Sequence, residues 1–231
     1  MLQRLASPFQ EYGFGSGLLY TLGRVLGRIS SRLHLYCYDM MVQPIPERDL
    51  LPARLAGRVQ MRELGQGDPE IDEMPIRPEI RESRFEQKAV CLGAFQENRF
   101  IGYIWFSFGS YDEDEARCRY LLKPEHESVF DFDIYVFPRY RMGIAFMAIW
   151  NGANTYLRGR GVTHSYSRLT RFNVASRRAH DHLGWKRLGQ IVVLSAWGVE
   201  VFMATMRPFL RVTLSRTARV DVELRPDVLR P

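Results

Sequence analysis

Residues 131–161, "DFDIYVFPRYRMGIAFMAIWNGANTYLRGRG", form a strand pattern that ends at a proline, followed by a helix pattern. Polar and apolar side chains alternate as far as Val136, which is typical of a half-buried strand, and residues 144–158 follow a helical repeat. The alternation places Asp131, Asp133 and Tyr135 on one face, opposite Phe130, Phe132, Ile134 and Val136. The two aspartates are therefore expected to share the polar face of this strand.

The joint between strand and helix combines a glycine with two fixed positive charges. Pro138 stops the strand, and Gly143 is expected to adopt backbone angles that are closed to other residues. A helix that begins here offers free N–H groups and the positive end of its dipole, and Arg139 and Arg141 add bidentate donors. The joint thus predicts a site for phosphate or pyrophosphate. The alternative is an ordinary turn whose arginines contact only water.

Composition limits the partners. The 231 residues carry a formal charge of +6, almost wholly from arginine, which suits planar anions. The arginines are scattered rather than massed, so no nucleic-acid partner is expected. Cys37, Cys91 and Cys118 are odd in number and widely spaced, which implies neither a disulfide framework nor a zinc site. A reducing compartment follows, so the expected location is the cytoplasm.

Residues 14–33 predict a basic amphipathic helix. Apolar residues recur at helical spacing, while Arg24, Arg28 and Arg32 recur on another face. These arginines interrupt the apolar run, so the segment is neither a secretory leader nor a membrane span. One interpretation is peripheral contact with an anionic membrane, which would place the protein at the inner membrane surface. The other is packing against its own domain or a second subunit in a homodimer.

The rest of the chain predicts a mixed α/β (α+β) fold. We expect a strand at 34–45, at most two short helices near 47–57 and 78–87, and a hairpin around Glu97-Asn98. Further strands are expected at 116–122, 128–138, 163–169, 186–198 and 199–209, with a helix at 173–183. The expected domains are an amphipathic extension (1–33), one domain (34–207) and a polar, arginine-rich tail (208–231) that wraps the surface or frays.

Two segments carry a family resemblance. Residues 136–145, "VFPRYRMGIA", and 173–185, "NVASRRAHDHLGW", resemble the GNAT superfamily of acyl-CoA-dependent N-acyltransferases. Its patterns are V-x-P-x-x-R-x-x-G-x-G/A, and N-x-x-A/S-x-x-x-Y followed by G-F. The resemblance covers roughly residues 35–205 and depends on spacing, but Gly143 comes one residue early. His180 stands in the place of the tyrosine, and Trp185 replaces the phenylalanine.

The resemblance implies a central mixed, mostly antiparallel GNAT-like sheet flanked by helices, here with an extra N-terminal amphipathic helix. It also implies that the protein binds acetyl-CoA or another acyl-CoA as co-substrate, without a metal. The pyrophosphate would lie on the turn, held by Arg139, Arg141, Met142, Gly143, Ile144 and Ala145. The pantetheine arm would lie along Ile134, Tyr135 and Val136, where the fourth strand splays from the fifth, and would meet Asn173 and Ser176.

The implied reaction moves an acyl group to a primary amine of a small molecule or peptide. His180, at the tyrosine position, would protonate the departing thiolate, for which it must be an imidazolium. A lysine-like amine must first lose a proton, and Asp133 or Asp131 is the expected general base, with Asp133 ranked first because it is nearer the turn. Alternatively, an acidic loop could attract a cationic substrate through Glu113, Asp114 and Glu115. The competing hypothesis is a binding or accessory protein of this fold that has lost efficient chemistry, on a membrane surface.

Overall fold

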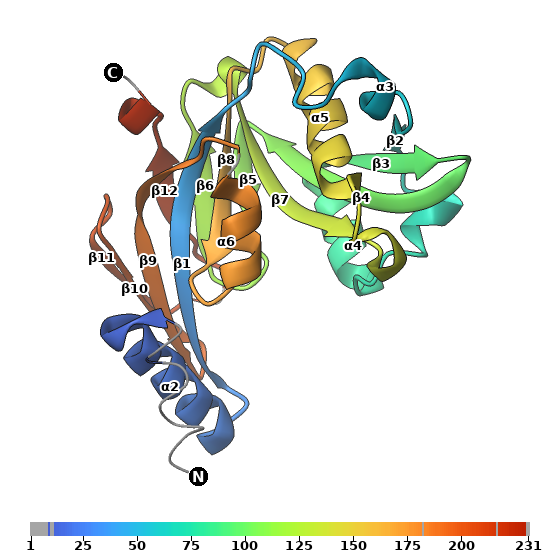
Figure 1. Cartoon of the computed structure of the whole chain (residues 1–231). Helices are drawn as coiled ribbons and strands as arrows, with labels where there is room; N and C mark the ends of the chain where they lie inside the picture. The colour runs from blue at the N-terminus through green and yellow to red at the C-terminus, as the bar shows by residue number, and fades with distance from the viewer. Residues whose placement is uncertain (1–8, 10–11, 182, 216, 230–231) are drawn as a thin grey trace. The chain divides into compact units, whose positions relative to one another are not determined.

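The computed structural model describes residues 9, 12–181, 183–215 and 217–229 (Figure 1). Residue contacts divide the chain into two compact units, each assembled from separate stretches of sequence. Unit 1 consists of Met1–Val42, Asp112–Tyr120 and Arg168–Pro231, and unit 2 consists of Gln43–Tyr111 and Leu121–Ser167.

Unit 2 is built on strands in the order β8-β7-β4-β3-β2. Their bounds are β2 (Gln60–Leu64), β3 (Val90–Gln96), β4 (Arg99–Phe108), β7 (Ser128–Val136) and β8 (His164–Thr170, as far as Ser167 in this unit). Neighbours pair antiparallel, except β7 and β8, which run parallel. The expected β3–β4 hairpin is confirmed: Glu97 and Asn98 form its two-residue turn, with φ angles of 51° and 61°, as such turns require.

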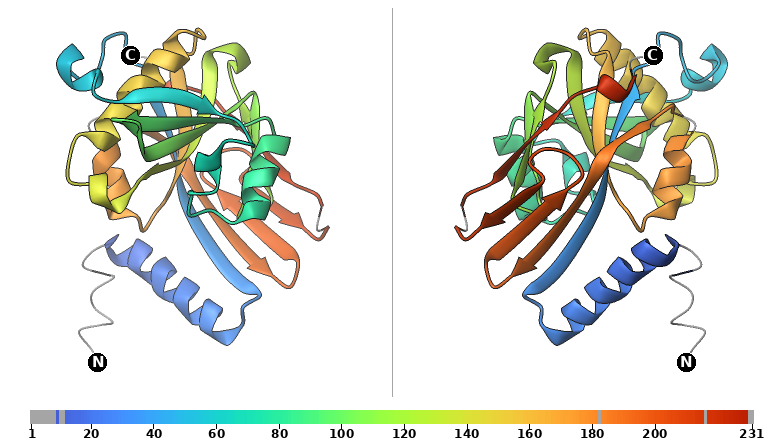
Figure 2. Two further views of the ribbon diagram at one scale, coloured as in Figure 1. Left: turned by 90° about the vertical axis from the view of Figure 1, so that its right-hand side faces the viewer. Right: turned by 90° about the vertical axis from the view of Figure 1, so that its left-hand side faces the viewer.

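Helices cover both faces of the unit 2 sheet (Figure 2). Helix α5 (Ala145–Arg158) packs on one face of β4 and β7, where Ile149 lies against Gly102, and also contacts the short α3 (Ala53–Ala56). Helix α4 (Pro78–Glu86) packs on the other face, with the Phe85 ring centroid 5.1 Å from that of Trp105. The core of unit 2 therefore lies in two layers, one on each side of β4.

Unit 1 is built on four antiparallel strands in the order β11-β10-β9-β1. Their bounds are β1 (Leu33–Pro44), β9 (Lys186–Ala196), β10 (Val199–Ala204) and β11 (Leu210–Thr213). Helices α2 (Phe14–Ile29) and α6 (Val174–Asp181) belong to this unit, as does β12 (Val220–Leu224), which pairs with β6 (Cys118–Leu122). Strand β5 (Ser110–Asp112) lies where the chain leaves unit 2.

The expected fold class is confirmed: a mixed, mostly antiparallel sheet is flanked by helices, and an N-terminal helix, α2, precedes it. Two segments differ from expectation. Residues 46–87, expected to hold only helices, also contribute β2. Residues 208–231, expected as a wrapping or frayed tail, contribute β11 and β12. Among the described helices, none is both long and apolar enough to cross a bilayer.

Candidate active site

The turn between β7 and α5 leaves a row of amides without partners. After Pro138 the chain makes one short 3-10 turn, Pro138–Tyr140, and α5 begins at Ala145 without a side-chain cap. Residues 141–144 form a loose turn, and within the described residues no acceptor in good hydrogen-bond geometry is found for the successive main-chain N–H groups from Met142 to Ala145. Four amide hydrogens at the positive end of a 14-residue helix are suited to bind an anion.

Two arginines flank these amides. Arg141 donates from Nε to the carbonyl oxygen of Val136 at 2.9 Å and lies over the Tyr135 ring at 5.2 Å. Arg139 lies over the Tyr140 ring at 4.9 Å. Both are exposed, and neither forms an ion pair with a carboxylate of the described residues. Their guanidinium groups therefore add positive charge beside the turn that no acid of the described chain neutralises.

The backbone of Gly143 does not adopt the conformation that was expected from the sequence. Its φ lies outside the left-handed region, so the backbone angles here are open to other residues. A Cβ added at Gly143 would meet only the carbonyl oxygen of Tyr140, at 3.9 Å. The glycine is thus not required by the fold of the turn. What it provides is a bare approach to the neighbouring amides.

Strand β7 carries a bulge just before the turn. Phe132 pairs with Trp105, and the next registered pair is Tyr135 with Tyr103. Between these two pairs β7 advances by three residues while β4 advances by two, so β7 contains one extra residue. Asp133 has a φ of 59°, which makes it the residue that absorbs the extra length. A bulge bends the strand and breaks its strict alternation of faces. The predicted arrangement of aspartates on one polar face is therefore wrong.

Asp131 lies in the interior of unit 2. It is 4% exposed, and Ser165 of β8 donates to it from Oγ, with 2.5 Å to Oδ2. Burial raises the pKa of Asp131 to about 7, although the bond from Ser165 opposes the shift. A carboxyl group with this pKa exchanges a proton near neutral pH, as a general base must.

Asp133 is instead paired with a buried arginine. Its Oδ2 is 2.6 Å from Nη1 of Arg84, whose side chain is 7% exposed. The Arg84 guanidinium lies over the rings of Trp105 and Phe132 at 5.4 and 5.1 Å. This pairing reverses the sequence ranking, because the carboxylate of Asp133 is committed to neutralising Arg84 while Asp131 has no cationic partner in the described residues.

The second predicted segment begins α6. Asn173 caps this helix: its Oδ1 accepts a bond from the main-chain N–H of Ser176 at 3.0 Å. His180 is 3% exposed, and its Nδ1 lies 2.7 Å from the carbonyl oxygen of Ser176. Because a carbonyl only accepts, Nδ1 must carry a hydrogen. Nε2 is then the position at which His180 gains or loses a proton.

The structure groups only part of the predicted site. Residues 131–145 lie together in unit 2, whereas Asn173, Ser176 and His180 belong to unit 1. Sequence reasoning missed Arg84 and Ser165, the partners of the two aspartates. Arg84 lies in a highly charged segment and Ser165 in a strand of alternating polar residues, so neither carried a distinguishing signal.

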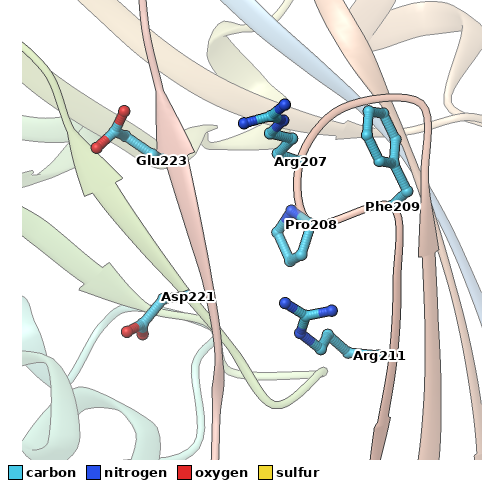
Figure 3. A pocket seen from close by; sticks show the side chains of 6 residues that line it. All are labelled: Arg207, Pro208, Phe209, Arg211, Asp221 and Glu223. Carbon is cyan, nitrogen blue, oxygen red and sulfur yellow. The ribbon is translucent and has the colours of Figure 1, made fainter.

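A separate cavity is lined by none of the predicted site residues. This open cavity of about 460 Å³ lies in unit 1. Figure 3 shows that its arginines, near β11, lie opposite the acids of β12. It is lined by Arg207, Pro208, Phe209, Arg211, Asp221 and Glu223. In the described part of the chain, no three His, Cys, Asp or Glu side chains gather as a metal site would need.

Comparison with known proteins finds solved structures that are similar to this chain. No family model matches the chain, and no curated protein matches it by sequence. A protein from Novosphingobium aromaticivorans, assigned to the GNAT acetyltransferase family, is 14% identical with a TM-score of 0.49, over 70% of this chain and 64% of that one. A tandem GNAT protein from the clavulanic acid biosynthesis pathway is 16% identical with a TM-score of 0.47, over 70% and 53%.

A GCN5-related N-acetyltransferase from Kribbella flavida is 12% identical with a TM-score of 0.44, over 79% of this chain and 64% of that one. The chain thus spans less than two thirds of the length of each of these proteins. The chain is similar to GNAT-family acetyltransferases of known structure.

Proposed function

We propose that this protein is an N-acyltransferase that moves an acetyl, or another acyl, group from acyl-CoA to a primary amine. The observation that carries the proposal is the row of unpartnered amides from Met142 to Ala145, flanked by Arg139 and Arg141. This row follows a strand that bends at Asp133. A diphosphate is the ligand whose charge and oxygen count suit such a turn.

The position of this turn indicates where the remainder of coenzyme A would bind. The pantetheine arm would extend from the diphosphate along Ile134, Tyr135 and Val136, the last residues of β7. Binding there competes with Arg141 for the Val136 carbonyl, so Arg141 would turn from the strand to the diphosphate. Asn173 and Ser176 are assigned to the arm by the family resemblance. Because Oδ1 of Asn173 caps α6, only its amide N–H groups remain for a ligand.

The proposed chemistry begins with the amine. Its ammonium form loses a proton to Asp131, whose pKa of about 7 lets it accept one near neutral pH. The amine nitrogen forms a bond to the thioester carbonyl carbon, the nitrogen of the tetrahedral intermediate releases its second proton to solvent, and the C–S bond then breaks. The family resemblance assigns the protonation of the thiolate to His180, which must first hold a proton on Nε2, since Nδ1–H is bonded to Ser176. Asp133 is the second choice of base.

Calorimetric titration with acetyl-CoA tests the anion turn. Gly143→Glu should abolish binding, because the added carboxylate would lie beside the amides, while the melting temperature should not change, because the site has room. The matched control is Gly67→Glu, another exposed glycine with open space and an ordinary φ, which should bind as the wild type does. Wild-type affinity in Gly143→Glu would remove the turn as the diphosphate site.

A second candidate function is a CoA-binding or accessory module without efficient chemistry. The observation that favours it is the burial of the proposed catalytic groups, since Asp131 is 4% and His180 3% exposed. The two functions separate when acetyl-CoA is mixed with a panel of primary amines and free thiol is measured. Thiol release that depends on the amine supports the transferase. Tight binding of acetyl-CoA without any release supports the module.

The location we propose is the cytoplasm. Cys37, Cys91 and Cys118 are all buried as free thiols, and burial raises the pKa of Cys37 to about 11. Thiols of this kind react slowly but persist best in a reducing compartment. Alkylation of the unfolded chain taken directly from cells would count three free thiols if this location is right, and fewer if the chain is oxidised there.

A further inference from the structure

Helix α2 presents its apolar side to solvent. Five large side chains along one stripe of the helix are exposed, and we call them the outer face: Phe14 (80%), Leu18 (54%), Leu22 (44%), Val25 (46%) and Ile29 (68%). Their spacing of three or four residues places them on one side of the helix. Leaving this much apolar surface in water is unfavourable, so the outer face calls for a partner.

The fold uses the opposite side of the same helix. Gly17 is buried, and a Cβ at Gly23 would lie 3.6 Å from Cβ of Leu35 on β1. The Tyr20 ring packs edge-on against Phe172 at 5.2 Å. Helix α2 is therefore already fixed to unit 1 through small and aromatic residues, and the outer face is left over from folding.

The charge beside the outer face has one sign. Arg24, Arg28 and Arg32 follow the helix at intervals of four residues, and no acid occurs between Glu11 and Asp39. Arg24 contacts only the hydroxyl of Tyr20 among the described polar groups, at 3.3 Å. An apolar stripe bordered by arginines matches the surface of a bilayer that contains anionic lipids, where the charges meet headgroups and the stripe meets acyl chains.

An exposed tryptophan lies at the C-terminal end of this helix. Trp197 forms the tight β9–β10 turn with a φ of 48° and is 61% exposed. Its main-chain N–H donates to the carbonyl oxygen of Arg32 at 3.4 Å, which ties the turn to the end of the α2 segment. Tryptophan is enriched where a membrane meets water, because its ring is apolar and its N–H is polar.

Further exposed apolar residues lie on the sheet face that α2 contacts. The register pairs Leu35 with Leu194, Leu194 with Val201, and Val201 with Val212, so these residues share the sheet face on which Leu35 meets α2. On that face Val212 is 58% exposed, and Met203 and Leu210, which pair with each other, are 39% and 56% exposed.

We propose that the outer face of α2, with the Trp197 turn, is a docking surface for an anionic lipid bilayer. A second copy of the chain is a poorer occupant, because a symmetric pairing through α2 would bring arginines against arginines with no acid to neutralise them. Helix α2 has sixteen residues, and arginines interrupt its apolar run. Such a helix is suited to lie on a bilayer rather than to cross it. This proposal does not depend on the transferase chemistry.

Flotation with lipid vesicles tests the proposal on the full chain. The protein should float with vesicles of equal parts phosphatidylcholine and phosphatidylserine, and much less with phosphatidylcholine alone. Arg24→Gln with Arg28→Gln should lower partitioning about 25-fold, at about fivefold for each arginine. Arg54→Gln with Arg58→Gln is the matched control, since these two exposed arginines have the same spacing outside α2 and should leave binding unchanged.

Two further measurements address the apolar contact. Leu18→Gln with Leu22→Gln keeps good helix formers but should lower partitioning at least about tenfold. Vesicles should also shift the tryptophan emission to the blue. Of the other three tryptophans, Trp105 and Trp150 are fully buried and Trp185 is half-buried outside the proposed surface, so most of the shift should vanish in Trp197→Phe.

Three results would overturn the docking surface. The first is equal flotation with neutral and anionic vesicles. The second is wild-type binding by the arginine or leucine pair variants. The third is a dimer in lipid-free sedimentation that the leucine variant converts to a monomer, because the outer face would then be a subunit interface.

Discussion

The hydroxyl of Ser165 donates a hydrogen bond of 2.5 Å to the carboxyl group of Asp131, within the four-residue ladder where β7 and β8 run parallel. No described cation accompanies this pair, and Asp131 is almost fully buried. Burial without a counter-charge favours the protonated acid, so a group that is ordinarily ionised above pH 4 changes its charge near neutrality here.

The stability of the protein should fall as pH rises from about 4 to about 7. Over that window the folded state keeps a proton on Asp131 that the unfolded chain releases, because the pKa of Asp131 is raised from 3.8 to about 7. The loss amounts to about 4 kcal/mol by linkage. Urea unfolding at a series of pH values should show this fall for the wild type, and Asp131→Asn should remove most of it.

The matched control for that series is Asp72→Asn, whose side chain is 84% exposed, and which should follow the wild-type profile. Identical pH profiles for the wild type and Asp131→Asn would mean that the pKa of the Asp131 carboxyl group is not raised in the folded protein.

Asp133→Asn should destabilise the fold by about 3 kcal/mol. Asparagine tolerates the left-handed backbone of this position, so the loss comes from removing the carboxylate that lies 2.6 Å from the buried Arg84 guanidinium. Adding Arg84→Met should recover most of that loss, because the flexible methionine fills the space between Trp105 and Phe132. A double-mutant cycle from urea unfolding measures the coupling, and additive losses would rule it out.

Asn173→Ala should lower stability by about 1 kcal/mol through loss of the α6 cap, whereas Asn173→Ser should not, because serine also caps helices. Titration with acetyl-CoA separates the cap from the proposed contact with the pantetheine arm. If both variants bind more weakly, the amide of Asn173 contacts the ligand. If Asn173→Ser binds as the wild type does, the residue is only a cap.

Gly102→Ala should cost at least about 2 kcal/mol. A Cβ there would lie 2.3 Å from the carbonyl oxygen of Tyr135 and 2.8 Å from Cδ1 of Ile149, so β4 and β7 must move apart next to the bulge. Gly67→Ala, which meets nothing, is the control. Thermal unfolding of the two variants checks the difference, and equal melting temperatures would show that the strands yield without cost.

The sequence predicted those elements whose local pattern matches their final surroundings. The β3–β4 hairpin carries its own turn residues, Glu97 and Asn98, and α5 follows a regular apolar repeat. Strand β2 was missed because its residues are mostly polar, since it lies at the edge of its sheet. Strand β11 was missed because it is only four residues long, and β12 was missed because its exposed positions carry the acids Asp221 and Glu223.

The site was harder to predict than the fold. The anion turn was visible because proline, arginine and glycine stand close together in the sequence. The bulge at Asp133 was not, because polar and apolar residues alternate through it without interruption, and only the pairing with β4 reveals the extra residue. The separate partners of the two aspartates come from distant stretches of chain, so no local pattern could identify them.

The way the chain passes between the two units bears on how it folds during synthesis. All of unit 2 has left the ribosome once Ser167 has emerged, whereas unit 1 needs residues from both ends of the chain. Strand β1 must therefore wait for β9, its neighbour in unit 1, which is made some 150 residues later. Until then the edge of β1 that pairs with β9 has no partner in the nascent chain, and an unpaired strand edge of this kind is prone to aggregate.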